Sequence, residues 1–355
     1  MKVLITGVCG FVGSSLAEFF LKLTEGISVC GIDNLMRAGS EINRPRLRKL
    51  GVEFVHGDIR SSSDVAALPK AEWVIDAAAN PSVLAGVGAG NTSRQLLEHN
   101  LASLMNVLEY CKHHGAGLIL LSSSRVYSIA ALAALPLRDN GKAFVLDDSG
   151  MLPEGVSRRG VGPEFSTQAP ISLYGSTKLA CEVLALEYGE AFDFPVWINR
   201  CGVIAGAGQF GVPDQGIFAY WVNAHLRQRP LKYIGFDGKG KQVRDALGPL
   251  DLARLISEQL RTKRKGGQRI YTIGGGAGNA MSLRELNDWC NQRFAPREPA
   301  SELIARRYDI PWIILDNSSA QRDFGWSPTV GLHEILSEIA GHAEQNPDWL
   351  ERSGL

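Results

Sequence analysis

The stretch KVLITGVCGFVGSSLAEFF, residues 2–20, decides the fold of this chain. A short apolar run ends at Thr6, three glycines follow at Gly7, Gly10 and Gly13, and an amphipathic helical pattern runs on from them. Glycines at this spacing permit a tight turn from strand to helix and let a pyrophosphate approach the backbone amides at the helix N-terminus. The stretch therefore predicts a dinucleotide-binding unit.

Strand and helix patterns alternate outward from this turn through the first part of the chain. The apolar runs are short, as strands buried on both faces of a parallel sheet must be. We therefore expect an α/β fold, a Rossmann-type doubly wound parallel sheet covered by helices on both faces. The expected strands are 2–6, 28–33, 52–57, 73–78, 117–123 and 196–202, and the expected helices are 11–24, 62–68, 93–114 and 174–190.

The pattern after residue 202 is less regular and predicts a smaller, mixed C-terminal substrate lobe. We expect helices at 214–228, 249–263, 282–293 and 331–343. The predicted cofactor domain spans 1–202, with 241–275 returning to it through a strand in QRIYTIGG, and the lobe comprises 203–240 and 276–355. The segment between residues 128 and 171 shows no sustained period, and a loop of that length is usually functional.

Composition excludes several classes of partner. Thirty-seven basic and thirty-seven acidic residues cancel, so we expect no binding to nucleic acid or to a membrane surface. The six cysteines show no metal-ligand spacing and predict buried, reduced thiols and no metal site. The chain enters a strand at once and has no apolar run of membrane-spanning length, so we expect no signal peptide and a cytoplasmic location.

An acidic residue at the end of the second strand favours NAD as the cofactor. Asp33 follows Gly13 by twenty residues and can bond an adenosine ribose diol while repelling a 2′-phosphate. Arg37 opposes this preference, because a nearby guanidinium can accept that phosphate. Asp58, after the third strand, is expected near the adenine, or it is simply a loop-capping residue.

SLYGSTKLACE, residues 172–182, places Tyr174 and Lys178 four residues apart in a helical pattern, and therefore on one helix face. Such a pair also occurs by chance on exposed helices. Here the fifth strand ends in Ser122, Ser123 and Ser124, and strand ends at this edge of a parallel sheet are where ligands bind. A neighbouring ammonium and a cationic nicotinamide ring stabilise a phenolate, so Tyr174 can act as a base towards a sugar or alcohol hydroxyl.

These features together resemble the extended short-chain dehydrogenase/reductase superfamily of NAD-dependent nucleotide-sugar epimerases and dehydratases. Further matches are NRCGVIAGAGQFG, KQVRDALGPLDLARLI and DNSSAQRDFGWSP. The segments SSSRVYSIAALAALPL, FVLDDSGMLPEG, QGIFAYWV and YIGFDGKGKQVRD are similar to the CDP-paratose 2-epimerase (CDP-tyvelose epimerase) branch. One departure is DAAAN at 76–80, where many relatives have a His-Leu-Ala-Ala type segment.

The resemblance implies tightly held NAD, a nucleotide-sugar substrate, and a homodimer or homotetramer assembled through helices 93–114 and 174–190. It implies catalytic roles for Ser123, Tyr174 and Lys178. The implied cofactor-binding residues are Gly7, Gly10, Phe11, Val12, Gly13, Asp33, Asn34, Arg37, Asp58, Ile59, Ala78, Asn100, Tyr174 and Lys178. The implied substrate-binding residues are Ser124, Arg125, Asn199, Gln209, Gln215 and Arg244, the last as a ligand of the diphosphate or else as an ion-pair partner of Asp245 or Asp251.

Among the reactions of this superfamily, the residues favour epimerisation. A 4,6-dehydratase commonly has an Asp-Glu pair directly after the catalytic hydroxyl, whereas this chain has Ser124 and Arg125, which cannot readily protonate a leaving hydroxyl. The expected reaction is inversion at C2 of CDP-paratose. A UDP-sugar 4-epimerase, a dehydrogenase and a non-catalytic dinucleotide sensor are the alternatives.

Overall fold

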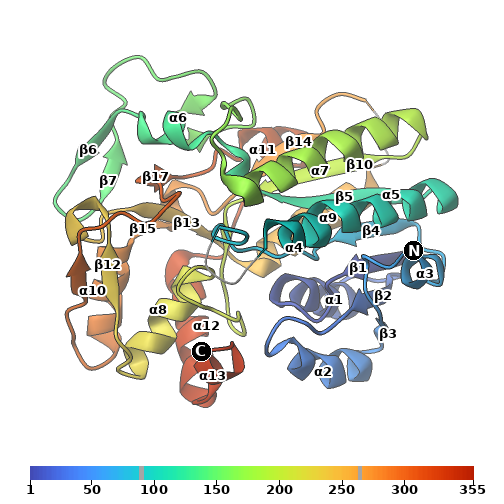
Figure 1. The fold of residues 1–355 in the computed structure, drawn as a ribbon, viewed down its shortest axis with the longest axis horizontal. Coiled ribbons are helices and arrows are strands. Elements are labelled where there is room, and N and C mark those ends of the chain that lie inside the picture. The colour runs from blue at the N-terminus through green and yellow to red at the C-terminus, as the bar shows by residue number, and fades with distance from the viewer. Residues whose placement is uncertain (88–91, 263–265) are drawn as a thin grey trace.

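The computed structural model describes residues 1–87, 92–262 and 266–355. Its main sheet has seven parallel strands in the order β14-β10-β5-β4-β1-β2-β3 (Figure 1). Their bounds are β1 Lys2–Thr6, β2 Ser28–Asp33, β3 Glu53–His56, β4 Trp73–Asp76, β5 Gly117–Ser123, β10 Val196–Cys201 and β14 Ile270–Ile273. The doubly wound parallel sheet predicted from the sequence is confirmed.

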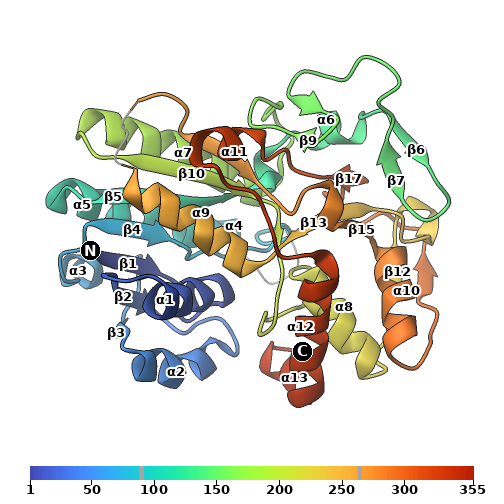
Figure 2. The same ribbon diagram turned by 180° about the vertical axis from the view of Figure 1, so that it is seen from behind.

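Helices cover both faces of this sheet (Figure 2). Apolar side chains of α1 Phe11–Leu23, α2 Asn43–Leu50, α9 Pro249–Arg261 and α11 Ser318–Phe324 share one buried cluster. Those of α3 Ser62–Ala66, α5 Ser103–His114 and α7 Ser172–Ala191 share the cluster on the other face. The expected helix 93–114 is divided by a π-helical turn, Glu98–Ala102, that follows α4 Ser93–Leu97. Position 263, the expected end of α9, lies outside the described residues.

The strand order reverses between β1 and β4, which are neighbours although two strands separate them in sequence. In open α/β sheets, ligands bind outside the carboxyl ends of the strands at such a switch point. The glycine turn after β1 and the serines at the end of β5 both lie at that edge. The topology therefore puts the two predicted halves of the site at one crevice.

The second lobe has its own sheet and core. Strand β13 Val243–Leu247 pairs with β11 Val203–Ile204, β15 Ala280–Ser282 and β17 Trp312–Ile313. A separate pair joins β12 Lys232–Ile234 to β16 Ala300–Glu302. The helices are α8 Ile217–Leu226, α10 Leu283–Arg293, α12 Leu332–Gln345 and α13 Trp349–Arg352. Of the segment 241–275, β14 joins the main sheet, whereas β13 belongs to this second sheet.

The segment from 128 to 171, expected as a loop without period, contains short elements. These are α6 Ile129–Ala133, the antiparallel pair β6 Leu137–Asp139 and β7 Phe144–Leu146, and the pair β8 Val156–Ser157 and β9 Gly160–Val161. Strands of two or three residues are too short to produce a recognisable period. The Asn140-Gly141 dipeptide, with Gly141 at φ 96°, was the available hairpin signal.

The segment 128–171, the insertion, packs on the second lobe and holds the residues at the start of β13 in place. The amide of Phe144 donates to the Lys241 carbonyl at 2.9 Å, and the Ser282 hydroxyl donates to the Lys142 carbonyl at 2.9 Å. The side chains of Lys241 and Asp139 form an ion pair. The position of residues 241–244 is therefore set partly by the insertion.

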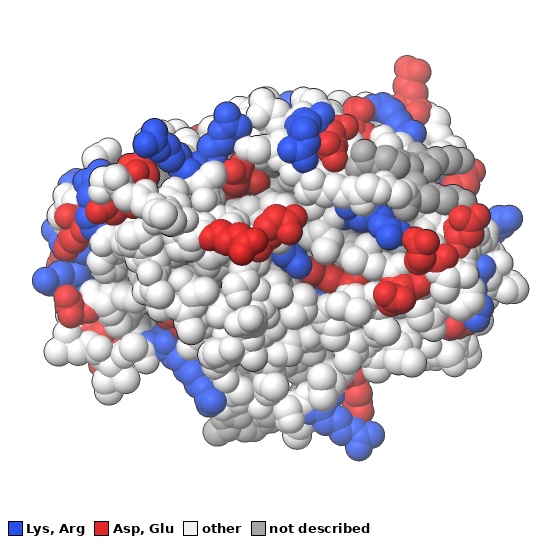
Figure 3. Space-filling view, turned by 90° about the horizontal axis from the view of Figure 1, so that it is seen from above, with Lys and Arg blue, Asp and Glu red and all other residues white. Residues whose placement is uncertain are grey.

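The charge balance and the state of the cysteines were also predicted from the sequence. Acidic and basic side chains are intermingled on the face shown in Figure 3. All six cysteines are buried and free, as expected. Among the described residues, no helix is both long and apolar enough to cross a membrane.

Candidate active site

A cavity of ≈ 600 Å³ opens at the switch point between the glycine turn and the end of β5. Most of the predicted site residues line it. The predicted cofactor residues on its wall are Gly7, Gly10, Phe11, Val12, Gly13, Asp33, Asn34, Arg37, Asp58, Ile59, Ala78 and Tyr174. The predicted catalytic and substrate residues on its wall are Ser123, Ser124, Arg125, Gln209, Gln215 and Arg244.

The glycine turn leaves no room for side chains. Gly7 has φ +63°, and a Cβ there would lie 2.9 Å from the Ala78 Cα. A Cβ on Gly13 would lie 2.3 Å from the Gly7 carbonyl oxygen. Gly10 caps α1 without any side-chain cap, so the first amides of the helix are available to an anion. The turn fits the pyrophosphate of NAD on its backbone.

Asp33, the last residue of β2, is buried beside this turn. Its carboxylate accepts hydrogen bonds from the amides of Cys9 at 2.9 Å and Leu35 at 2.8 Å. Burial raises its pKa, while these backbone amides act in the opposite direction. Arg37, the residue that could accept a 2′-phosphate, donates to the Phe210 carbonyl at 2.5 Å. The carboxylate thus both fixes the glycine turn and faces the cavity where a ribose would lie.

Asp58 and Asn34 form a second polar edge of the cavity. The Asn34 amide nitrogen donates to the Asp58 carboxylate at 3.0 Å, and Arg60 pairs with the same carboxylate at 2.6 Å. The Arg60 hydrogen bond holds the pKa of Asp58 well below its usual range. Asp58 is therefore an ionised, fixed acceptor beside Ile59.

Helix α7 carries Tyr174 and Lys178 on the side that faces β5. Tyr174 is 6% exposed and lines the cavity, whereas Lys178 lies behind it and donates to the Leu121 carbonyl at 3.0 Å. Burial alone would lower the pKa of the Lys178 ammonium. The phenolate form of Tyr174 and the buried Asp76 carboxylate more than offset this, so that pKa is raised and the charge is kept.

Ser122, Ser123 and Ser124 have different surroundings because β5 ends at Ser123. Ser122 also lines the cavity, and its hydroxyl donates to the Glu182 carboxylate at 2.5 Å. The Ser123 hydroxyl accepts from the Arg125 amide at 3.1 Å and remains partly exposed in the cavity. Ser124 begins a short 3₁₀ turn, Ser124–Val126. Of the three serines, Ser123 is therefore the only one that is not buried at the wall that Tyr174 also lines.

A second cavity of ≈ 350 Å³ lies among α8, β12, β13 and β15, and Arg125, Gln215 and Arg244 line both spaces. Arg244 donates to the Asp309 carboxylate at 2.9 Å and to the Ile310 carbonyl at 2.8 Å. Burial lowers the pKa of Arg244 to about 10, opposed by Asp309 and aided by the neighbouring Arg125. Two guanidinium groups thus mark the junction between the cavities.

Three predicted residues, Asn100, Lys178 and Asn199, do not line either cavity. Asn199 is completely buried in β10, and its amide exchanges hydrogen bonds with the Gln259 amide at 2.9 and 2.8 Å. Asn100 is buried in the π-helical turn, where it bonds the backbone of Asn80 at 2.7 and 3.1 Å. Asn199 therefore stabilises the interior of the protein, and Asn100 holds Asn80, a residue of the cavity wall, in place.

Gln242, which lines the second cavity, was not predicted from the sequence. Gln242 precedes Arg244 by two residues, so strand alternation could have placed both on one face. Asp309 reaches Arg244 from 65 residues away, and no local pattern marks that pairing.

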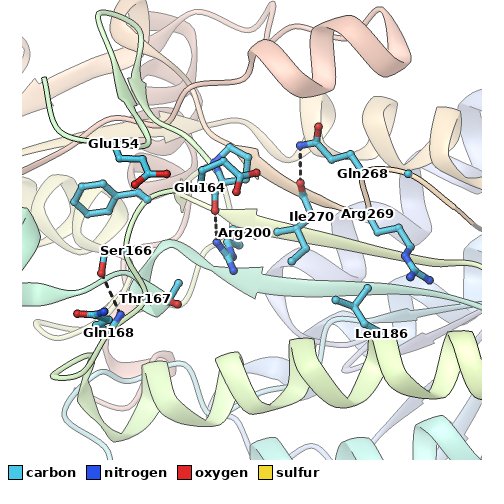
Figure 4. Close-up of a pocket in the computed structure, with 13 residues that line it drawn as sticks. Glu154, Glu164, Ser166, Thr167, Gln168, Leu186, Arg200, Gln268, Arg269 and Ile270 are labelled. Atoms are coloured by element: carbon cyan, nitrogen blue, oxygen red, sulfur yellow. Dashed lines mark hydrogen bonds between the residues drawn. The ribbon is translucent and has the colours of Figure 1, made fainter.

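Another cavity, ≈ 730 Å³, opens beside the edge strand β14 (Figure 4) and shares no lining residue with the cavity at the switch point. Glu154, Glu164, Leu186 and Arg269 are among its lining residues, and none of the predicted site residues is. At its base Arg200 donates to the Pro163 carbonyl at 2.8 Å and pairs with Glu182 at 2.8 Å. The cavity at the switch point, which most of the predicted site residues line, is therefore the candidate active site.

Comparison with known proteins agrees with this geometry. Residues 3–274 match the model of the NAD dependent epimerase/dehydratase family. The chain is 31% identical to the CDP-paratose 2-epimerase of Salmonella typhi, over 96% of this chain and 98% of that protein. It is 25% identical to the UDP-glucuronate 4-epimerase of Thermodesulfobacterium geofontis, over 97% and 96%. The chain is also similar to a solved structure of a mutant UDP-glucuronic acid 4-epimerase from Bacillus cereus, which is in complex with a fluorinated UDP-glucuronic acid and NAD. The TM-score is 0.77 and the sequence identity 25%, and the match covers 97% of this chain and 99% of that one.

Proposed function

The chain belongs to the NAD dependent epimerase/dehydratase family, with NAD as its cofactor, and from that premise we propose that it is a nucleotide-sugar epimerase. We propose further that it inverts C2 of CDP-paratose to yield CDP-tyvelose. The observation that carries the proposal is the cavity that joins the glycine turn, Ser123 and Tyr174, and that continues past Arg244 into a second space.

The glycine turn would hold the pyrophosphate of NAD and Asp33 its adenosine ribose. NAD, when bound, supplies a hydride acceptor and donor for the sugar carbon. The Tyr174 oxygen removes the proton from the sugar hydroxyl, and the charge of the buried Lys178 ammonium stabilises the negative oxygen that results. Ser123 orients the same sugar oxygen. Tyr174 returns the proton after the transient 2-keto sugar has presented its opposite face.

Epimerisation requires that the nucleotide be held while the sugar turns. Arg244 and Arg125, at the junction of the two cavities, would hold the diphosphate. Gln209 and Gln215 line the space left for the sugar. Asp309 occupies one edge of Arg244, so a bound diphosphate would share or replace that contact.

The proposal is tested by mixing the protein with CDP-paratose, without added NAD, and following sugar stereochemistry by NMR. Interconversion at C2 supports it, whereas inversion at C4 of UDP-glucose alone would favour the UDP-sugar 4-epimerase. Turnover that depends on added NAD would favour a dehydrogenase. Tyr174→Phe should retain NAD and lose turnover by about 10²- to 10⁴-fold, and full activity in that variant would remove the proposed base.

We also propose a homodimer formed through the helices beside the active site. Helices α4, α5 and α7 lie side by side (Figure 1) and leave large apolar side chains exposed. Leu97 is 46% exposed, Met105 52% and Val183 55%. Analytical ultracentrifugation of the wild type and of Met105→Glu with Val183→Glu tests this, because two buried carboxylates would prevent assembly.

A further inference from the structure

Asp76, the last residue of β4, is a buried carboxylate to which the proposed mechanism assigns no part. It is 4% exposed and does not line the cavity at the switch point, although the four residues that follow it do. Thr6, its partner in the strand register, donates its hydroxyl to the carboxylate at 2.6 Å. The same Thr6 oxygen accepts the amides of Ala77 and Ala78 at 3.1 Å. The carboxylate is therefore fixed beside the residue that precedes the glycine turn.

Strand alternation places the Asp76 side chain on the face of the sheet that α7 covers. Val74, two residues earlier in β4, belongs to the buried cluster that α5 and α7 share, whereas Trp73 and Ile75 belong to the cluster on the other face. Side chains two residues apart in a strand lie on the same face, so Asp76 points towards α7 as Val74 does. Lys178 reaches the sheet from that helix.

The Lys178 ammonium lies on the side of β5 that faces β4. Backbone groups of successive residues in a strand point to opposite neighbours, and the Gly117 amide donates to the carbonyl directly before β4 at 3.0 Å. Leu121, four residues later, therefore also points towards β4, and its carbonyl accepts from Lys178 at 3.0 Å. Asp76 ends β4 opposite Leu120, and neighbouring strands lie about 4.8 Å apart. The ammonium and the carboxylate are thus neighbours at the end of β4.

The groups around this pair leave Asp76 as its negative charge. The other titratable side chains that act on the pair are those of Tyr174, Cys111, Cys181 and Cys201. Burial raises the pKa of each of the three thiols, so they are uncharged near neutral pH. Glu182, one helical turn beyond Lys178, is bound to Arg200. Burial also raises the pKa of Asp76, but the Lys178 charge and the Thr6 hydroxyl oppose this.

We infer that Asp76 is a positioning residue whose carboxylate, fixed by Thr6, is the counter-ion that keeps the Lys178 ammonium charged and in place behind Tyr174. A buried ammonium without a counter-ion tends to lose its proton. The pair also joins the two halves of the site, because Thr6 precedes the glycine turn and Tyr174 stands one helical turn before Lys178. The contribution to catalysis rests on the proposed function, whereas the pairing itself does not.

Urea denaturation of Asp76→Asn, Lys178→Met and the double variant tests the pairing without any substrate. Each single variant leaves one buried charge without its partner and should lower the urea midpoint, whereas the double variant leaves neither charge. The double variant should therefore lose clearly less than the sum of the two single losses. Asp251→Asn combined with Lys178→Met is the matched control. Asp251 is completely buried in α9 on the other face of the sheet, so those two losses should add.

The pH profile of turnover separates a counter-ion from a residue that only fills space. Without the carboxylate the pKa of Lys178 falls, so Asp76→Asn should lose turnover at a pH about one unit or more below that at which the wild type loses it. A residue with only a packing role would lower turnover equally at every pH. Additive losses in the urea experiment, or a pH profile of unchanged shape, would overturn the inference.

The remaining outcomes are also decisive. If Asp76→Asn does not fold, recovery of folding in the double variant supports the pairing, and a double variant that does not fold either contradicts it. The proposed function is judged separately by the NMR assay. Non-additive losses in a protein without epimerase activity would uphold the pairing and reject that function, and epimerase activity with additive losses would do the reverse.

Discussion

The buried ion pair between Glu182 and Arg200 supports the catalytic helix, and its loss should destabilise the whole protein. Glu182 follows Lys178 by one helical turn, and the side chains of Glu182 and Arg200 are 2% and 6% exposed. Three hydrogen bonds of 2.8 to 3.1 Å join them, and Ser122 adds one of 2.5 Å to the same carboxylate. Glu182→Gln preserves the shape and leaves the Arg200 charge buried without a counter-ion.

Removing one partner of such a pair costs about 3 to 5 kcal/mol. Arg200 keeps its bond to the Pro163 carbonyl, its stacking over the Tyr127 ring and an edge on the ≈ 730 Å³ cavity, so we expect the lower value, about 3 kcal/mol. For a chain of 355 residues this corresponds to a fall in Tm of about 4 °C.

Urea denaturation followed by circular dichroism measures this loss. The matched control is Glu344→Gln, which breaks the exposed pair with Arg293 and should cost less than about 1 kcal/mol. Replacing both Glu182 and Arg200 with Met should recover much of the stability, because no isolated charge remains. A Glu182→Gln protein as stable as the control would refute the reasoning.

Three other substitutions test the cofactor site and the second lobe. Gly13→Ala places a Cβ against the Gly7 carbonyl and should lower NAD affinity by about tenfold or more; retention of NAD through purification, read from the nucleotide released on denaturation, would contradict this. Asp33→Asn should lower the affinity for NAD by about tenfold and so bring the affinities for NAD and NADP closer together. Fluorescence titration with both reduced cofactors measures this, and an unchanged ratio of the two affinities would show that Asp33 does not select between them. Burial raises the pKa of Asp245 to about 6, so this group favours folding below about pH 4 and that contribution is lost as the pH rises to about 6. Asp245→Asn should therefore flatten the stability profile across that interval in urea denaturation, and a profile parallel to the wild type would exclude the effect.

The sequence by itself determined the main sheet and the cofactor half of the site, because the signals there are local. The glycine turn is one continuous segment, and a short apolar run predicts each central strand within two residues of its observed bounds. The Tyr174–Lys178 spacing is a property of one helix. The Rossmann topology then requires the ends of β1 and β5 to meet at the same edge, so Tyr174 and Ser123 could be placed beside the glycine turn from the sequence.

Only the tertiary structure decided the substrate half of the site. The strand pattern around Asn199 does not say which face of the sheet its side chain lies on. In the structure the side chain is buried, because it bonds the side-chain amide of Gln259 on α9. Arg244 donates a hydrogen bond to Asp309, and the amide of Phe144 donates one to the Lys241 carbonyl, although each pair is far apart in the sequence. Such contacts depend on how two lobes and an insertion pack, and packing between segments far apart in sequence leaves no periodic signal within either one.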